Sequence, residues 1–413
     1  MTTTAEPSHT PPTDPGEVLL GLGNTVDYEI AWDARVVSHL LRRYGVRLED
    51  DPVHGSIATE ADLVRALLTH VREGSGGEHF VATTELLDRF SGRFRTAVTL
   101  GGTNVRAALA MRALGRSATV HLVSTNEHTR RLLPSDIPTI SSAREDSLDP
   151  HVIVQFPAGT TLEAVDGTVT SPRANRVILT NDAPNRELVV AEALGDAAAV
   201  ARVVLISGFN SMQEPELLEQ RMADVLRHIA RRPRGSIAVY EHGAFHVPAF
   251  SKRVREVVGP HVDVWCCNEE ELQEHVGREV DLLDPRDVLD AARRLHRDVA
   301  APTLVVHTRH WALALGGPAE RRRAMVFGGT ALAGIRYAHG DAADSDHLDE
   351  AAGWPLQAEG AEFAVAVEAL GGEDITCIAA YAVPTTTPTT IGLGDAFAGG
   401  VVAALAALPP AMD

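Results

Sequence analysis

The most constraining feature of the sequence is a regular alternation of apolar runs and amphipathic stretches that begins near residue 200. Apolar runs such as RVVLISGF (202–209), GSIAVYEHG (235–243) and TLVVHTRHWALAL (303–315) indicate buried strands, and stretches such as ELLEQRMADVLRHIARR (216–232) indicate the helices between them. Strands that alternate with helices predict a mostly parallel sheet covered on both faces. Ligands bind beyond the carboxyl ends of such strands, so we expect functional side chains directly after them.

The first half of the chain interrupts this alternation with several helical stretches and a region rich in β-structure but poor in helix. We therefore predict a small α+β lid domain inserted into a large α/β domain. The predicted lid comprises residues 30–99 and 128–181, and the predicted large domain comprises residues 17–29, 100–127 and 182–413.

Two further segments have unusual composition. Residues 1–16 are rich in Pro, Thr and acidic residues and predict a disordered tail. Residues 317–375 are rich in Ala, Gly and acidic residues, and we expect them to be irregular.

Composition excludes several classes of protein. A formal net charge of −19 argues against a nucleic-acid-binding protein, which needs a basic face to displace counterions from phosphates. Lys252 is the only lysine, so neither a Walker A loop nor the strand lysine of a protein kinase is present. No apolar run has the length of a membrane span, the N-terminus does not resemble a secretory signal, and the three cysteines form no disulfide or zinc pattern. These features favour a cytoplasmic protein that binds neither membranes nor nucleic acids.

The strongest local motif is TTIGLGDAFAGGVVAALAAL (389–408), in which Gly392 and Gly394 precede Asp395 and a helix of small residues follows. Glycines let the backbone approach an anion closely, and a helix N-terminus presents free N–H groups to phosphate oxygens. An aspartate at that place would repel a phosphate, so its sensible task is to accept a proton from an attacking hydroxyl. Asp395 could instead simply cap a helix after a glycine turn.

With this motif the chain resembles the ribokinase superfamily, and within it the ADP-dependent glucokinase/phosphofructokinase family. The segments that carry the resemblance occur in the family's order: GNTVD (23–27), GGT (101–103), SPRANRVI (171–178), ISGFNSM (206–212), CNEEEL (267–272), VVHTRHWALAL (305–315) and VPTTTPTTIGLGD (383–395). The resemblance implies a ribokinase-like three-layer α/β sandwich with a lid. It also implies transfer of the β-phosphate of ADP to a hydroxyl of a hexose or hexose phosphate, with release of AMP.

The resemblance assigns catalytic and metal-binding roles to individual residues. Asp395 would be the general base, and the backbone amides of Gly392, Leu393 and Gly394 would form the anion hole. Mg²⁺ would lie near Asp395 and three further residues that match the family's metal motifs, Glu241, Asn268 and Glu271. Carboxylate and amide oxygens suit such a hard cation. An acidic start of a helix is the ordinary alternative explanation for the segment NEEE.

The resemblance also assigns the acceptor and nucleotide sites. The residues implied for acceptor binding are Thr25, Asp27, Gly101, Gly102, Arg173, Asn175 and Arg176. His307, Thr308, Val383 and Gly394 lie in segments that resemble the nucleotide pocket. His307 could equally be a structural strand histidine. The lid arginines could either hold a sugar phosphate through a guanidinium fork or tie the lid to the core.

Two departures from the family pattern lie on the acceptor side: Thr25 replaces an asparagine, and Arg106 follows the GG turn. They suggest phosphoryl transfer to a shifted acceptor. One alternative is an ATP-dependent kinase of the same fold, and another is a sugar- or nucleotide-binding sensor that has lost catalysis. A Rossmann dehydrogenase is disfavoured because no G-x-G-x-x-G opens an early βαβ unit.

Overall fold

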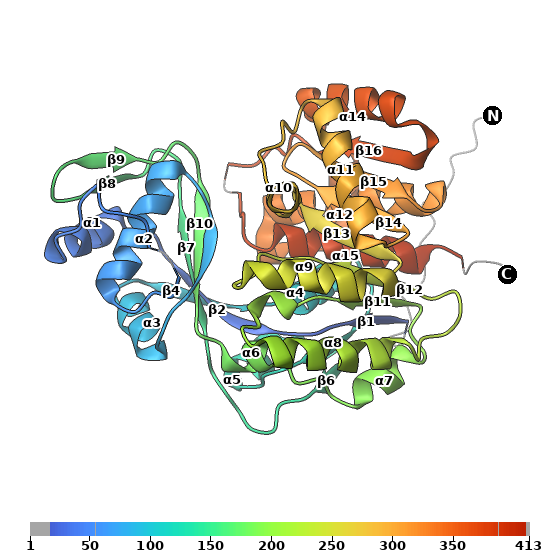
Figure 1. The fold of residues 1–413 in the computed structure, drawn as a ribbon, viewed down its shortest axis with the longest axis horizontal. Helices are drawn as coiled ribbons and strands as arrows, with labels where there is room; N and C mark the ends of the chain where they lie inside the picture. The colour runs from blue at the N-terminus through green and yellow to red at the C-terminus, as the bar shows by residue number, and fades with distance from the viewer. Residues whose placement is uncertain (1–16, 54, 387, 410–413) are drawn as a thin grey trace.

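The computed structural model describes residues 17–53, 55–386 and 388–409; the predicted tail of residues 1–16 lies outside this part. The chain forms a large domain and a smaller one beside it, which is the blue and green body at the left of Figure 1. In the described residues no helix is both long and apolar enough to cross a membrane. All three cysteines carry free thiols.

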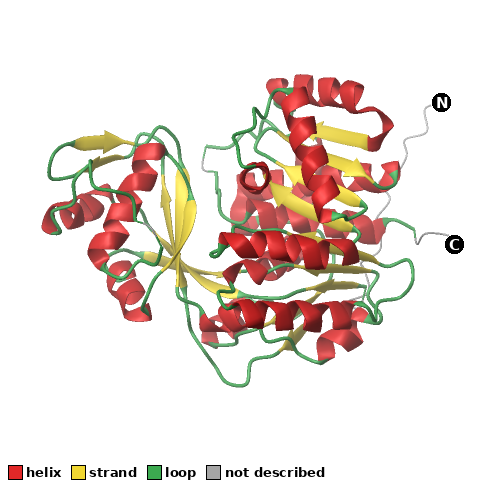
Figure 2. Cartoon of the chain, in the orientation of Figure 1, coloured by secondary structure: helices red, strands yellow, loops and turns green. Residues whose placement is uncertain are grey.

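The large domain is built on a nine-stranded sheet whose strands are parallel except for β15, which runs antiparallel to both of its neighbours. In spatial order the strands are β16 (Ile375–Ala379), β15 (Trp311–Gly316), β14 (Thr303–His307), β13 (Val264–Asn268), β12 (Ile237–Glu241), β11 (Val203–Ile206), β1 (Val18–Leu20), β5 (Thr119–Leu122) and β6 (Thr139–Ser141). Most residues of the central strands are buried, as expected for a sheet that helices cover on both faces (Figure 2). The predicted mostly parallel sheet is therefore confirmed.

Helices cover the two faces of the large sheet and bury separate apolar cores. On one face lie α7 (Ala193–Ala198), α8 (Pro215–Ile229), α9 (Pro248–Val258), α10 (Glu269–Val276), α11 (Pro285–Val299) and α14 (Ala358–Gly371). On the other lie α4 (Thr103–Ala113), α12 (Ala319–His339) and α15 (Leu393–Ala407). The remaining helices of this domain are α5 (Glu127–Leu132), α6 (Ala183–Glu187), α13 (Asp346–Ala352) and the short 3₁₀ turns η1 (Phe209–Ser211), η2 (Gly259–His261), η3 (Gly340–Ala342) and η4 (Gly372–Asp374).

The smaller domain is a five-stranded sheet with its own apolar core. Its strands are, in spatial order, β3 (Gly77–Phe80), β10 (Asn175–Thr180), β7 (His151–Phe156), β2 (Thr25–Ile30) and β4 (Thr96–Gly101). Its remaining elements are α1 (Ala34–Arg43), α2 (Glu60–Glu73), α3 (Thr84–Ser91) and the hairpin of β8 (Thr161–Glu163) and β9 (Thr168–Thr170). This is the predicted α+β lid.

The lid boundaries differ from the predicted ones at two places. Strand β2 begins at Thr25 and pairs with β4 and β7 of the lid sheet, although residues 17–29 were expected in the large domain. Strand β6 pairs with β5 at the edge of the large sheet, although residues 128–181 were expected in the lid. Sheet membership depends on which strand supplies hydrogen-bonding partners, and such non-local pairing leaves no periodicity in the sequence.

The expectation that residues 317–375 are irregular was wrong, because this segment contains α12, α13 and α14. The glycines that suggested irregularity allow α12 and α15 to pack closely. A Cβ atom added at Gly328 would lie 2.6 Å from the carbonyl oxygen of Gly400, and one added at Gly400 would lie 2.1 Å from that of Gly328. These glycines lower the helix propensity of the segment. They also permit backbone contact between α12 and α15, and this packing favours the helical structure.

Candidate active site

A cavity of about 310 Å³ lies between the two domains. The large domain lines it with residues at or directly after the carboxyl ends of β11, β12, β13 and β14 and with the start of α15. The lid lines it with one face of its sheet. Polar and ionisable side chains from distant parts of the sequence converge there, which is typical of a binding or catalytic site. The cavity lies where the carboxyl ends of the strands predicted it.

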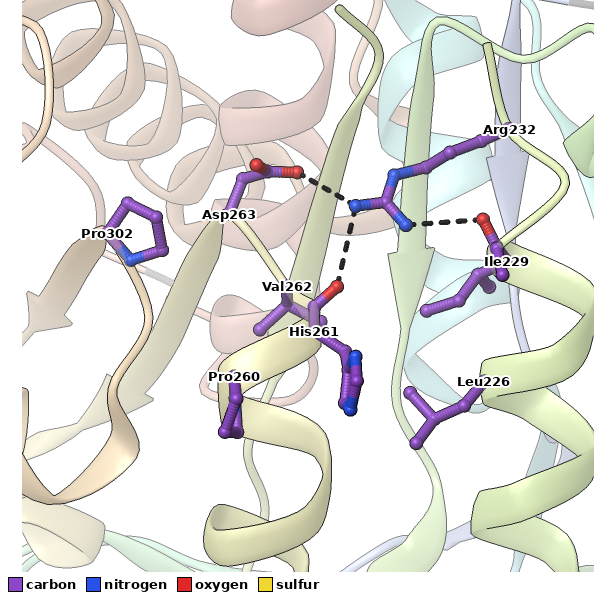
Figure 3. A pocket seen from close by; sticks show the side chains of 9 residues that line it. Leu226, Ile229, Arg232, Pro260, His261, Val262, Asp263 and Pro302 are labelled. Atoms are coloured by element: carbon purple, nitrogen blue, oxygen red, sulfur yellow. Dashed lines mark hydrogen bonds and ion pairs between the residues drawn. The ribbon is translucent and has the colours of Figure 1, made fainter. Parts of the chain in front are cut away.

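A second hollow, of about 260 Å³, lies at the other end of the same strands (Figure 3). Asp263 and Pro302 line it and directly precede β13 and β14. The guanidinium of Arg232 is engaged there, because it donates to the carbonyl oxygens of Ile229 and His261 and reaches Asp263 at 3.5 Å. A hollow whose cation is already paired offers little chemistry, so the cavity between the domains is the candidate active site.

The GLGD turn forms one wall of this cavity. Gly392 is the N-cap residue of α15, and its φ of 70° is a left-handed conformation that favours glycine. A Cβ at this position would also lie only 2.8 Å from Cδ of Arg106. Asp395 lies in the first turn of α15, and its side chain is 24% exposed. The free amides of this helix end and the Asp395 carboxylate thus share one corner of the cavity.

Arg106 joins this corner to the lid. Its guanidinium donates to Asp27 Oδ2 at 2.7 Å, lies 3.6 Å from Glu29 Oε1, and has Nε 3.9 Å from Asp395 Oδ2. The other carboxylate oxygen of Asp27 accepts a hydrogen bond from Thr25 at 2.6 Å. Burial alone would lower the pKa of Arg106, but the charges of the surrounding carboxylates outweigh this effect and raise the pKa above its ordinary value. Arg106 is therefore a permanent cation between Asp27, which is predicted to bind the sugar, and Asp395, the predicted base.

The predicted metal residues form another wall of the cavity. Glu241 ends β12, Asn268 ends β13, and Glu271 lies in the first turn of α10. Asn268 and Glu271 also form a reciprocal capping box, so the ordinary helix-start explanation describes part of their role. Burial, and then repulsion from Glu241, raise the pKa of Glu271 to about 8. Burial also raises the pKa of Glu241.

His307 lines the cavity beside this acidic wall. Its Nε2 lies 3.3 Å from Glu241 Oε1, and its ring stacks on Phe397 with centroids 4.5 Å apart. Burial alone would lower the pKa of His307, but the hydrogen bond and charge of Glu241 raise it. The ring also contacts the position of Gly394, where a Cβ would lie 3.4 Å from the imidazole. The histidine thus links the acidic wall to the GLGD turn.

The lid arginines are placed differently from each other. Arg173 lies outside the cavity lining and donates from Nε to the carbonyl oxygen of Gly74, which Asn175 also contacts. Arg176 lines the cavity, and within the described residues its guanidinium has no hydrogen bond or ion pair. A half-buried guanidinium without a protein partner suits an anionic ligand group.

Four other predicted site residues do not line the cavity: Gly101, Leu393, Thr308 and Val383. A Cβ at Gly101 would lie 2.3 Å from the Asp27 carboxylate, so this glycine leaves room for that side chain. Leu393 begins α15. Thr308 uses its hydroxyl within the β14–β15 turn, where it accepts from the N–H groups of His310 and Trp311, and Val383 packs on a small cluster around Trp354.

Sequence reasoning missed two histidine–carboxylate pairs. His246, from the loop after β12, lies 3.2 Å from Glu78 on β3 of the lid and thus connects the domains. His151 on β7 lies 3.1 Å from Asp182 and is buried. No motif surrounds either histidine, and only the strand pairing of His151 with Asp27 places it at this site.

We expect His151 to make stability depend on pH. Burial would lower the pKa of His151, but Asp182, Asp27 and Glu78 raise it to about 9. A histidine whose pKa is raised by folding stabilises the protein fully below its unfolded pKa, and that contribution is lost as the pH rises through the folded value. The free energy of unfolding should therefore fall by about 3 kcal/mol more in wild type than in His151→Asn between about pH 6.5 and pH 9.

Denaturant unfolding across this pH range measures that difference. His39→Asn, at an exposed position on α1, should keep the wild-type slope. If the free energy of unfolding changed with pH equally in wild type and in His151→Asn, the pKa of His151 would not be raised by folding and the prediction would be wrong.

Comparisons with known proteins agree with the geometry. Residues 16–402 match the conserved region of the ADP-specific phosphofructokinase/glucokinase family. The structure of a hypothetical ADP-dependent phosphofructokinase from Pyrococcus horikoshii OT3 superposes with a TM-score of 0.71 at 15% identity, over 95% of this chain and 98% of that one. A search of curated protein sequences gives no significant match.

Two further structures are similar. A phosphofructokinase from Pyrococcus horikoshii OT3 with AMP gives a TM-score of 0.73 at 15% identity, over 94% of this chain and 97% of that one. An ADP-dependent kinase in complex with fructose-6-phosphate and ADPβS gives 0.69 at 14% identity, over 91% of this chain and 96% of that one. At such identities the likeness establishes the fold, which is the predicted ribokinase-like α/β architecture with a lid. Because the family match spans nearly the whole described chain, the protein belongs to the ADP-specific phosphofructokinase/glucokinase family of ADP-dependent sugar kinases.

Proposed function

We propose that the protein transfers the β-phosphoryl group of ADP to a hydroxyl of a hexose or hexose phosphate and releases AMP, with Asp395 as the general base. The observation that carries this proposal is the position of Asp395 in the first turn of α15, on the wall of a cavity that also contains Asp27, Glu241 and Glu271. A carboxylate there can accept the proton of an attacking hydroxyl while the helix amides hold the transferred group.

The acidic wall fits a divalent cation. Glu241 Oε2 is buried and has no hydrogen-bond partner among the described residues, and burial followed by repulsion from Glu241 raises the pKa of Glu271. A cation would bind the unpaired Oε2 of Glu241 and relieve the repulsion between Glu241 and Glu271. Glu241, Glu271 and Asn268 are the residues that would hold Mg²⁺, directly or through water, with Asp395 facing the same space. When bound, Mg²⁺ would neutralise charge that develops on the phosphates.

The acceptor side favours an anionic sugar. Arg176 lines the cavity and has no side-chain hydrogen bond or ion pair among the described residues, and Arg106 adds a buried positive charge. Asp27 remains able to accept hydrogen bonds from sugar hydroxyls, because a carboxylate offers about four lone-pair sites and two are in use. We therefore propose a hexose phosphate rather than a neutral hexose as the acceptor.

A substrate panel tests this function. Glucose and fructose 6-phosphate are each incubated with ADP or ATP and Mg²⁺, and AMP or ADP release is measured. The expected result is AMP formation with ADP and fructose 6-phosphate. Turnover with ATP alone would identify the ATP-dependent alternative, and calorimetric binding of both ligands without product would identify a sensor.

Replacing Arg176 with glutamine tests the acceptor assignment. Loss of a charge-assisted contact worth about 1.5–3 kcal/mol should raise the KM for a hexose phosphate by about 10- to 150-fold. The KM for ADP should change little. Arg173→Gln is the matched control, because Arg173 contacts a backbone carbonyl outside the cavity. A larger effect on the KM for ADP would instead place Arg176 at the donor.

Replacing Glu271 with glutamine tests the metal assignment. The amide keeps the shape of the side chain but removes its charge, so the Mg²⁺ concentration for half-maximal activity should rise by about 10- to 100-fold. Saturating Mg²⁺ should restore much of the activity. Glu274→Gln, one turn further along α10 and outside the cavity lining, should keep the wild-type Mg²⁺ requirement. An unchanged requirement in Glu271→Gln would contradict the assignment.

A further inference from the structure

A second cluster of metal-ligating side chains lies outside the candidate active site, where α12 is followed by α13. His339 is the last residue of α12, and His347 and Glu350 lie on α13. One nitrogen of each ring and one oxygen of the Glu350 carboxylate all lie within 4.8 Å of one another. None of the three residues lines the active-site cavity.

The sequence places two of these ligands on one helix face. His347 and Glu350 are three residues apart on α13, so their side chains project in the same direction. His339 meets them from the other helix: its ring centroid is 3.7 Å from that of His347, and its Nε2 is 3.1 Å from Glu350 Oε2. That nitrogen is nevertheless buried, and no residue in the described part of the chain forms an aligned hydrogen bond with it. An unprotonated ring nitrogen without a hydrogen bond can bind a cation through its lone pair.

Asp344 lies against Nδ1 of His347. When Nδ1 carries the ring proton, it can donate to the Asp344 carboxylate 2.8 Å away, and when it does not, it accepts from the Asp344 backbone N–H at 3.1 Å. The first of these tautomers leaves Nε2 unprotonated and able to bind a metal. A carboxylate behind a histidine is the usual outer partner of a metal-ligating imidazole.

We propose that His339, His347 and Glu350 bind a divalent ion of the zinc class, with water as the fourth ligand. Two imidazoles and one carboxylate form a donor set that favours Zn²⁺ or Co²⁺ over Mg²⁺, which prefers oxygen ligands. Ligand atoms around tetrahedral zinc lie about 3.3 Å apart, given bonds of about 2.0–2.1 Å. Small side-chain rotations from the observed arrangement would complete the site.

An ion at this place would strengthen a corner that supports the GLGD turn. Arg336, in the last turn of α12, donates from Nε to the carbonyl oxygen of Ile391 at 2.7 Å. The N–H of Thr389 donates to the carbonyl oxygen of Tyr337 at 3.2 Å. The ion would fix α13 against the end of the helix that holds this segment, so the proposed role is structural.

Metal titration of the whole protein tests the proposal. Protein freed of metal by a chelator is titrated with Co²⁺ in excess Mg²⁺, which keeps the oxygen-rich active site occupied, and visible absorption and calorimetry report binding. Wild type should bind one Co²⁺ per chain at this site, and Zn²⁺ should displace it and raise the Tm. His347→Ala should lose that binding and the rise in Tm. Asp344→Ala should bind about 10- to 100-fold more weakly.

Two variants keep the test specific. His39→Ala, at an exposed histidine on α1, should retain wild-type binding. Glu350→Gln, which preserves the shape of the side chain, should weaken binding and serves as the comparison if His347→Ala does not fold. Equal affinity in wild type, His347→Ala and Glu350→Gln would overturn the proposal. Binding that is lost in Glu241→Gln and kept in His347→Ala would also overturn it, because the ion would then lie in the active site.

Discussion

Replacing Asp395 with asparagine should lower kcat by about 100- to 10,000-fold, because the variant loses the group that accepts the proton of the attacking hydroxyl. The amide keeps the shape of the side chain and leaves the amides of the GLGD turn in place. Calorimetry should therefore give an ADP affinity close to that of wild type. AMP release under saturating ADP, acceptor and Mg²⁺ measures the change in kcat.

Asp136→Asn is the control for this substitution, because Asp136 pairs with Arg112 at the protein surface and lies outside the cavity. It should retain wild-type turnover. Wild-type turnover in Asp395→Asn would exclude Asp395 as the base. A loss of turnover together with a loss of ADP affinity would instead indicate that the substitution disrupts the turn.

Replacing Arg106 with methionine should lower the free energy of unfolding by about 3–5 kcal/mol, the usual effect of removing one partner of a buried ion pair. The Arg106 side chain is 4% exposed and that of Asp27 is 6% exposed, so water compensates only poorly for the lost cation. Methionine keeps much of the apolar stem but leaves the Asp27 carboxylate buried beside Glu29 and Asp395. Denaturant unfolding at neutral pH measures the effect.

Arg112→Met on the same helix is the matched control. Arg112 and Asp136 are 48% and 61% exposed, so this substitution should cost about 1 kcal/mol or less. Adding Asp27→Asn to Arg106→Met should recover part of the loss, because the uncompensated charge is then removed. If Arg106→Met were as stable as Arg112→Met, the ion pair of Arg106 with Asp27 would not stabilise the fold.

The chemistry-bearing residues at strand ends could be predicted from the sequence. The alternation of strands and helices predicted a site at the carboxyl edge of the sheet, and Glu241, Asn268 and His307 do end β12, β13 and β14. The GLGD motif likewise contained its own geometry, because a left-handed glycine followed by a helix creates a turn with free amides. Such features depend on residues that are neighbours along the chain.

Contacts between distant segments were not predictable in this way. The sequence marked Arg106 as unexpected but could not show that it joins Asp27 to Asp395, since Asp27 lies on a strand of the lid and Asp395 on a helix of the large domain. It also could not separate Arg173, which holds a loop, from Arg176, which faces the cavity. Both belong to the same short motif, but Arg176 lies in β10 and is placed by the pairing of that strand, whereas Arg173 precedes β10 and is held by the carbonyl oxygen of Gly74.

The α/β fold class, a cavity at the strand ends and the turn before Asp395 could be predicted from the sequence, because local periodicity and turn chemistry encode each of these. Three features became visible only in the folded chain: which strands belong to the lid, that α12 is a helix despite its glycines, and which charges meet in the cavity. These outcomes depend on non-local backbone pairing and burial. The free energy of such contacts comes from partners that lie far away in the sequence.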